Sequence, residues 1–124
     1  LFQKAKQYLS TPVRKAGYMD KSQVTSDMVY AGETALAEKT MLNPGKVITY
    51  AVSDRNFDKK LLSDELADPA KQVRLELWAY DPKIFSKDSI VDNLSLALSF
   101  QDNPDERIEE AVEELVEGEL QENG

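Results

Sequence analysis

The chain has neither cysteine nor histidine among its 124 residues, and this double absence constrains both its fold and its chemistry. Without thiols no disulfide can hold the chain together, so a hydrophobic core must stabilise it. Without imidazole and thiol groups, the common nucleophile, general-base and zinc arrangements cannot be built. Carboxylates, lysines and hydroxyls would have to carry any reaction. We therefore expect a domain that binds other molecules, with no enzymatic activity, cofactor or metal.

Length and composition fit a single globular domain, which we expect to span residues 1–118. Hydrophobic residues make up 41% of the chain and charged residues 31%, an ordinary balance for a globular protein. No apolar run approaches the roughly 20 residues that span a bilayer, and basic residues interrupt the N-terminal segment where a signal peptide would be apolar. The sequence therefore predicts a soluble, cytoplasmic protein that does not contact membranes. Because the chain begins with Leu1, we also expect it to be part of a longer protein.

The first half of the chain contains one clear strand pattern and one clear helix pattern. β-Branched and aromatic residues fill positions 47–52 between turn-forming residues, which predicts a strand. Good helix formers fill positions 32–38, and Met41 and Leu42 continue the same apolar face. The other predictions are a helix over residues 1–9 that ends near Thr11-Pro12, a loop over 20–27, and a helix stop at 43–45. The pattern over 13–19 is ambiguous and compatible with a short extended segment.

Residues 73–80 carry the alternating pattern of a strand with one apolar face and one amphipathic face. We expect this strand to pair with the strand at 47–52. The connection between them holds a predicted helix over 57–66, which leaves parallel and mixed pairing open. After it, Ile84 and Phe85 predict a turn of helix. Residues 89–100 alternate as a strand would, but their leucine and alanine content favours a helix.

The final helix has the clearest pattern. Asn103 can cap it, Pro104 suits the first helical position, and Glu106 completes an arrangement similar to a capping box. Gly118 is a natural stop, beyond which we expect residues 119–124 to form a frayed acidic tail. The apolar stripe of this helix consists of Ile108, Ala111, Val112, Leu115 and Val116. Together, the patterns predict an α+β fold: a small mixed β-sheet covered by helices, with an acidic amphipathic C-terminal helix.

Charge is divided unevenly along the chain. Residues 1–62 hold ten basic and six acidic residues, a net of +4, whereas residues 63–124 hold five and seventeen, a net of −12. Residues 101–124 alone contain ten carboxylates and one arginine, but helical spacing favours a solvated face over a metal site. The overall charge of −8 argues against DNA binding by this chain alone.

Trp78, Tyr80 and Phe85 form the only aromatic concentration and are the candidate partner-binding residues. Trp78 and Tyr80 are two positions apart on the predicted strand, so they project from the same face. If a helix covers that face, the two side chains are core residues. If that face is open, they can anchor an interface, because aromatic side chains supply a large contact area at little entropic cost.

Several short motifs resemble the C-terminal part of bacterial winged-helix regulators similar to AbiE-type (type IV) antitoxins. These motifs are residues 30–37, Met41-Leu42-Asn43-Pro44 with the strand through Tyr50, Leu75-Glu76-Leu77-Trp78, Tyr80-Asp81-Pro82, and Asp105-Glu106-Arg107. The resemblance implies a regulatory α/β domain of a transcriptional regulator, in which an N-terminal domain absent from this chain would bind DNA. It implies no cofactor and no catalytic residue.

The sequence thus favours a non-catalytic regulatory or protein-interaction domain. Its partner could be another protein, the remainder of its own chain or a second copy of itself. Two alternatives stay open. One is a magnesium-dependent enzyme that transfers or hydrolyses nucleotides, with Glu33, Asp81 or Asp88 holding the metal. The other is a nucleic-acid mimic, in which the acidic last helix imitates a phosphate backbone.

Overall fold

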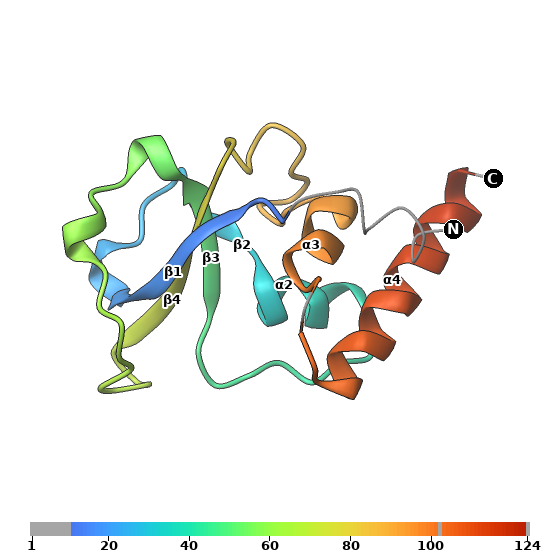
Figure 1. Cartoon of the computed structure of the whole chain (residues 1–124), viewed down its shortest axis with the longest axis horizontal. Helices are drawn as coiled ribbons and strands as arrows, with labels where there is room; N and C mark the ends of the chain where they lie inside the picture. The colour runs from blue at the N-terminus through green and yellow to red at the C-terminus, as the bar shows by residue number, and fades with distance from the viewer. Residues whose placement is uncertain (1–10, 102, 124) are drawn as a thin grey trace.

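A computed structural model describes residues 11–101 and 103–123 and confirms the α+β fold. The predicted helix over residues 1–9 lies outside these ranges. Figure 1 shows the sheet at one end of the molecule and helix α4 at the other. The strands are β1 (Val13–Asp20), β2 (Val29–Tyr30), β3 (Thr49–Ser53) and β4 (Gln72–Trp78), and the helices are α2 (Gly32–Lys39), α3 (Asn93–Ser99) and α4 (Glu106–Asn123). Three short 3-10 helices are η2 (Lys21–Gln23), η3 (Asp54–Asn56) and η4 (Lys59–Leu61).

The four strands form one mixed sheet in the order β1-β4-β3-β2. β4 is parallel to β3 and antiparallel to β1, while β2 pairs antiparallel with β3. The register aligns Ala51 of β3 and Ala16 of β1 with Glu76 of β4. The two strands predicted from the sequence therefore are neighbours, and their pairing is parallel. The short strand β2 had no clear sequence pattern.

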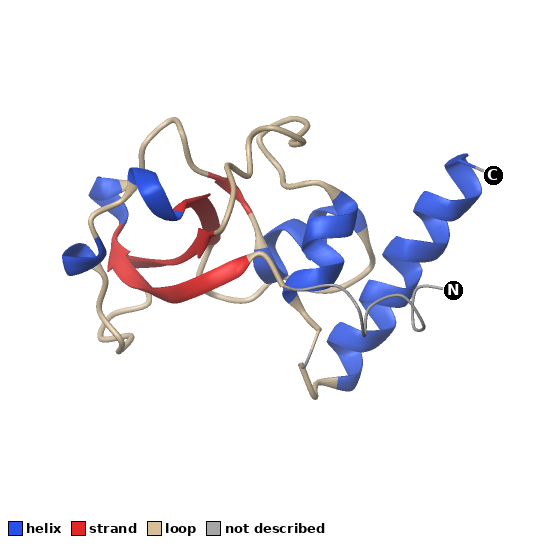
Figure 2. Cartoon of the chain, turned by 45° about the horizontal axis from the view of Figure 1, so that its top comes forward, coloured by secondary structure: helices blue, strands red, loops and turns tan. Residues whose placement is uncertain are grey.

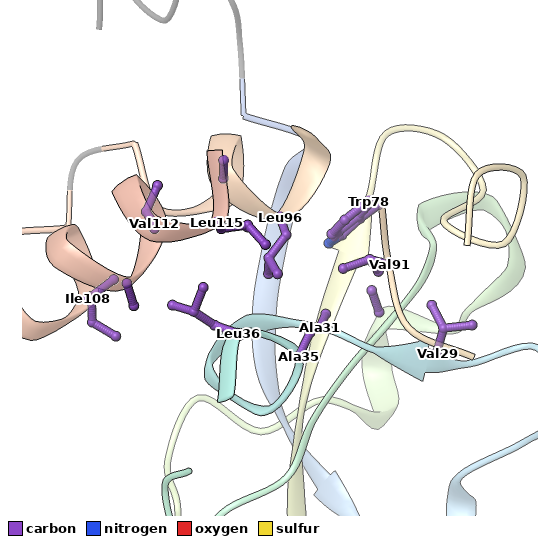
Figure 3. Close-up of a cluster of buried hydrophobic side chains, with 13 residues drawn as sticks. Val29, Ala31, Ala35, Leu36, Trp78, Val91, Leu96, Ile108, Val112 and Leu115 are labelled. Atoms are coloured by element: carbon purple, nitrogen blue, oxygen red, sulfur yellow. The ribbon is translucent and has the colours of Figure 1, made fainter. Parts of the chain in front are cut away.

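The larger of two hydrophobic clusters lies between the sheet and the helices. Figures 1 and 2 show α2 and α3 beside the sheet, with α4 packed on their far side. Trp78 of β4 and Leu96 of α3 meet in this cluster, and Leu36 of α2 faces Ile108 and Leu115 of α4 (Figure 3). The stripe predicted for the last helix is thus its buried face, because four of its five residues are buried.

A second hydrophobic cluster covers the opposite face of the sheet. It consists of Met19, Met28, Val52, Val73, Leu75 and Leu77. Val24, Phe57 and Leu62, which belong to the segments that follow β1 and β3, pack against it and are partly buried. Loops and 3-10 turns therefore cover this face in place of helices.

The segment between β3 and β4 contradicts the helix predicted over residues 57–66. It forms two 3-10 turns, and beyond them Ser63 bonds to the free edge of β1. The amide nitrogen and carbonyl oxygen of Ser63 each form a 2.8 Å hydrogen bond with Tyr18. A residue that exchanges both backbone bonds with a neighbouring strand must be extended, so the helix cannot continue through it. Pairing with β1 therefore determines the structure of this segment.

The bounds of two predicted helices also need correction. α2 ends at Lys39, because the backbone of Thr40 is extended. The Thr40 hydroxyl donates to the Leu36 carbonyl oxygen at 2.8 Å and accepts from the Leu42 amide at 3.2 Å. Met41, predicted to continue its apolar face, is 88% exposed. In the segment 89–100 the favoured helix is correct from residue 93 onward, where Asp92 caps it.

Helix α4 begins later and ends later than the sequence predicts. Asp105 precedes its first turn and accepts from the Arg107 amide at 2.9 Å, whereas Asn103 caps only a turn before the helix. The helix continues through Gly118 to Asn123, so the predicted stop is wrong. Nothing lies within 4 Å of the position that a Cβ at Gly118 would occupy. Gly118 does not have the positive φ of a glycine that ends a helix, so the helix continues through it.

Gly32 is the one glycine with positive φ among the described residues, and it opens α2 with a φ of 55°. A Cβ at this position would lie 2.8 Å from Cγ2 of Thr49 on β3. Both the left-handed backbone and the close approach of the strand require glycine. This residue therefore fixes the distance between α2 and the sheet.

We predict that Gly32→Ala lowers the free energy of unfolding by about 2 kcal/mol, because the left-handed conformation and the contact with Thr49 both penalise a Cβ. Gly118→Ala is the matched control, since its Cβ would meet nothing, and it should raise the free energy of unfolding by up to about 1 kcal/mol. Urea denaturation followed by circular dichroism measures both. Equal effects of the two changes would contradict this account of Gly32.

Candidate interaction surface

Trp78 is a core residue and cannot contact a partner directly. Its side chain is 0% exposed, which corrects its assignment as a partner-binding residue. The indole Nε1 donates to Oε1 of Glu76 at 3.1 Å, and its ring packs edge-on against Tyr80 with centroids 5.8 Å apart. α3 and α4 complete the enclosure of this strand face (Figure 3). Of the two alternatives, the covered face is therefore the correct one for Trp78.

Glu76 is the buried carboxylate beside Trp78. The residue is 3% exposed, and its two oxygens accept from the indole and from the Arg74 guanidinium. A buried carboxylate is tolerated only when such donors replace water. Both donors belong to β4 itself, two positions away on either side. These two hydrogen bonds give Glu76 a structural role: it orients the indole of Trp78.

Tyr80 lies at the boundary between the core and solvent. It is 37% exposed, and its hydroxyl lies 2.5 Å from Oγ of Ser95 on α3. Partial burial raises the pKa of the Tyr80 phenol, the Ser95 hydrogen bond opposes this shift, and the nearby Asp92 carboxylate adds to it. The contact joins the end of β4 to the start of α3.

Phe85 and Ile84 project from the loop between Tyr80 and Val91. They are 65% and 64% exposed, although Pro82, two positions earlier, is fully buried. The predicted turn of helix here is a series of hydrogen-bonded turns. Leu94 at the start of α3 is also exposed, at 54%. We define the loop surface as the large exposed residues of segment 80–94: Tyr80, Ile84, Phe85 and Leu94.

The base of this loop is fixed to the edge of the sheet. Lys87 and Ile90 exchange backbone hydrogen bonds of 3.0 Å around a turn in which Asp88 and Ser89 have φ angles of 55° and 62°. Tyr30 of β2 then donates to the Ser89 carbonyl at 2.8 Å and accepts from the Val91 amide at 3.0 Å. Two non-glycine residues with positive φ are uncommon and require a well-determined surrounding structure. The loop therefore presents its apolar tip from a fixed base.

Tyr80 and Phe85 were predictable from the sequence as surface residues, whereas Ile84 and Leu94 were not. Ile84 was expected in a turn of helix and Leu94 on a buried helix. Asp81-Pro82, which forces a turn after β4, was the signal that an apolar pair behind it could lie outside. No pattern in the sequence distinguished Leu94 from the buried Leu96.

The carboxylates considered for a magnesium site lie on different elements. Glu33 is in the first turn of α2, Asp81 accepts from the Lys83 amide at 2.9 Å, and Asp88 lies in the turn at the base of the loop. Over residues 11–101 and 103–123, no group of three or more acidic side chains is arranged to hold a metal ion. The described geometry therefore gives no support to a metal-dependent mechanism.

Comparison of the chain with protein-family models, curated proteins and solved structures finds no match. In the part of the chain that the structure describes, no helix has the length and apolar character required to cross a bilayer.

The burial of Trp78 and the exposure of Phe85 predict effects of very different size for substitution by alanine. Trp78→Ala should lower the free energy of unfolding by about 4 kcal/mol, because it leaves a large cavity and removes a donor from Glu76. Phe85→Ala should change it by no more than about 0.5 kcal/mol. Denaturant unfolding of both variants tests this. A large loss of stability in Phe85→Ala would mean that Phe85 packs in the core.

The raised pKa of the Tyr80 phenol predicts that the protein loses stability at alkaline pH. Because its pKa is higher in the folded protein than in the unfolded chain, its contribution is complete below the unfolded pKa and is lost as pH rises through the folded pKa. In Tyr80→Phe, the free energy of unfolding should decline less steeply above about pH 10 than in the original chain. Urea denaturation between neutral and alkaline pH measures the difference. Identical pH profiles would exclude this role of Tyr80.

Proposed function

We propose that this chain is a non-catalytic protein-interaction domain that docks through its loop surface. The observation that carries the proposal is the exposure of Ile84 and Phe85 on a loop with a fixed base. Large apolar side chains on a well-ordered loop are costly to leave in water and are typical anchors of interfaces. Their fixed base reduces the entropy that is lost on binding.

We propose a separate protein of net positive charge as the partner. The chain carries a net charge of −8, and the outward face of α4 presents glutamates to solvent beyond the buried stripe. α4 packs against α3, the helix that contributes Leu94 to the loop surface. Such a field increases the rate of encounter with basic proteins and repels acidic ones, while the apolar contacts determine how long the complex lasts. Charge complementarity therefore favours a basic partner over a second acidic copy.

We further propose that the domain is the regulatory part of a bacterial, cytoplasmic transcriptional regulator similar to AbiE-type antitoxins. The motifs quoted above support this assignment, and several have structural roles in the fold. Residues 30–37 join β2 to α2, and Trp78 ends β4 and packs edge-on against Tyr80. In such a regulator, a separate N-terminal domain would bind DNA, and this domain would bind the protein partner.

The two alternatives have less support. A magnesium enzyme requires carboxylates that converge, and Glu33, Asp81 and Asp88 do not converge. A nucleic-acid mimic would use the glutamates of α4 and would leave Ile84 and Phe85 without a role. Binding measured at several salt concentrations distinguishes a nucleic-acid mimic from a domain that docks through apolar contacts. A purely electrostatic complex dissociates as ionic strength rises, whereas a complex held by apolar contacts persists.

The test begins with capture of proteins from a lysate of the source organism on the immobilised chain. The captured protein is then purified, and its affinity is measured against the original chain and against Ile84→Ser and Phe85→Ser. Loss of an anchoring side chain should weaken binding at least about tenfold, through a faster dissociation rate. Leu66→Ser is the matched control, since Leu66 is also exposed but lies on the segment between β3 and β4.

Two results would contradict the proposal. One is a complex whose affinity is unchanged in Ile84→Ser and Phe85→Ser, which would place the interface elsewhere. The other is concentration-dependent dimerisation in sedimentation experiments that Phe85→Ser abolishes, which would make a second copy the occupant. If raising the salt concentration slows association but leaves the dissociation rate nearly constant, the steering role of α4 is supported.

A further inference from the structure

A pocket separate from the loop surface lies at the rim of the second hydrophobic cluster. It is formed between the segment that follows β1 and the 3-10 turns that follow β3, which lie side by side in Figures 1 and 2. Its volume is about 470 Å³. Pockets that hold small molecules in proteins typically have volumes of roughly 300–1,000 Å³. None of its lining residues belongs to the loop surface, although Lys83, next to Ile84, donates to the Ser26 carbonyl oxygen beside the pocket at 3.1 Å.

One part of the pocket wall is apolar. Met28 is buried in the second hydrophobic cluster, Phe57 packs against that cluster and is half-buried, and Leu61 is 48% exposed. These three side chains come from two separate segments and line one space. An aromatic ring beside aliphatic side chains suits a ligand that has a C–H face.

The rest of the wall is polar and rich in acceptors. Asp27 accepts from the Thr25 hydroxyl, and Oδ1 of Asp58 accepts from the Lys60 amide at 3.0 Å. Each carboxylate uses its Oδ1 in these bonds, so its Oδ2 can accept from a ligand. The carboxamides of Gln23 and Asn56 also line the pocket and can both donate and accept. A matching ligand must therefore offer several hydrogen-bond donors.

The lining of the pocket holds two carboxylates, Asp27 and Asp58, and no basic residue. Lys59, on a turn beside the pocket, pairs with Asp54 at 3.0 Å. Carboxylates beside an apolar wall can accept hydrogen bonds from the hydroxyl groups of a ring whose C–H face meets that wall. A cation is the competing ligand for the same carboxylates, so a cationic probe belongs in the test.

We propose that this pocket binds a neutral ring that carries adjacent hydroxyl groups, as in a monosaccharide or the ribose of a nucleoside. The C–H face of the ring contacts Phe57 and Met28, while its hydroxyls donate to Asp27 and Asp58 and bond to the Asn56 amide. Adjacent hydroxyls on one ring can reach two neighbouring planar groups at once, which gives the site selectivity for this class.

Ligand-observed saturation-transfer NMR on the purified chain tests the proposal. The probes are the methyl glycosides of glucose, galactose and mannose, the nucleosides adenosine and uridine, and agmatine as a cationic control. We expect millimolar binding of either the glycosides or the nucleosides, which distinguishes the two sources of the hydroxylated ring. Chemical-shift changes in the labelled protein should concentrate at residues 23–28 and 56–61.

Two variants localise the binding. Asn56→Ala, an exposed position in the pocket wall, should weaken it about fivefold, the value expected for one lost hydrogen bond. Asn43→Ala, exposed but outside this pocket, should leave it unchanged. Binding of agmatine alone, no binding of any probe, or equal binding by Asn56→Ala and the original chain would each overturn the proposal. Retained affinity of Asn56→Ala for the protein partner would show that the docking proposal stands independently.

Discussion

The burial of both faces of β4 from Leu75 to Trp78 is the constraint on which the rest of this structure depends. Leu75 and Leu77 point into one hydrophobic cluster, while Trp78 points into the other. A strand without a solvent face requires two covers, and a chain without disulfides has to build both from packing. The helices supply one cover. The segments that follow β1 and β3 supply the other. Glu76 lies within the first cover and is tolerated because Arg74 and the indole satisfy it.

The exposed surface follows from how β4 ends. Trp78 is buried, Tyr80 reaches across to α3, and Pro82 is buried again. The chain then returns to β2 through the turn at Asp88 and Ser89, where it bonds to Tyr30. Between these anchors, Ile84 and Phe85 stay exposed. Their exposure on an anchored loop is the basis for proposing that this chain acts by binding.

Sequence patterns predicted the elements whose residues interact locally. The alternation of residues 73–80 and the apolar stripe of the last helix both correspond to observed elements. Sequence patterns failed where contacts between segments far apart in the sequence determine the structure. The bonds between Ser63 and Tyr18 replace the predicted helix over 57–66, and helices far along the chain cover Trp78. The alternation also could not reveal that Glu76 is buried, since its pairing with Trp78 depends on that cover. For the loop surface, Tyr80 and Phe85 were predictable as aromatic residues, but the exposure of Leu94 was not.

We propose that this domain acts by contact through a loop held at its base. Hydrogen exchange measured by mass spectrometry, with and without the captured partner, tests this proposal most directly. The partner should slow exchange mainly over residues 80–95 and leave residues 21–28 and 54–61 nearly unchanged. Protection confined to α4, with no change in the loop, would contradict it.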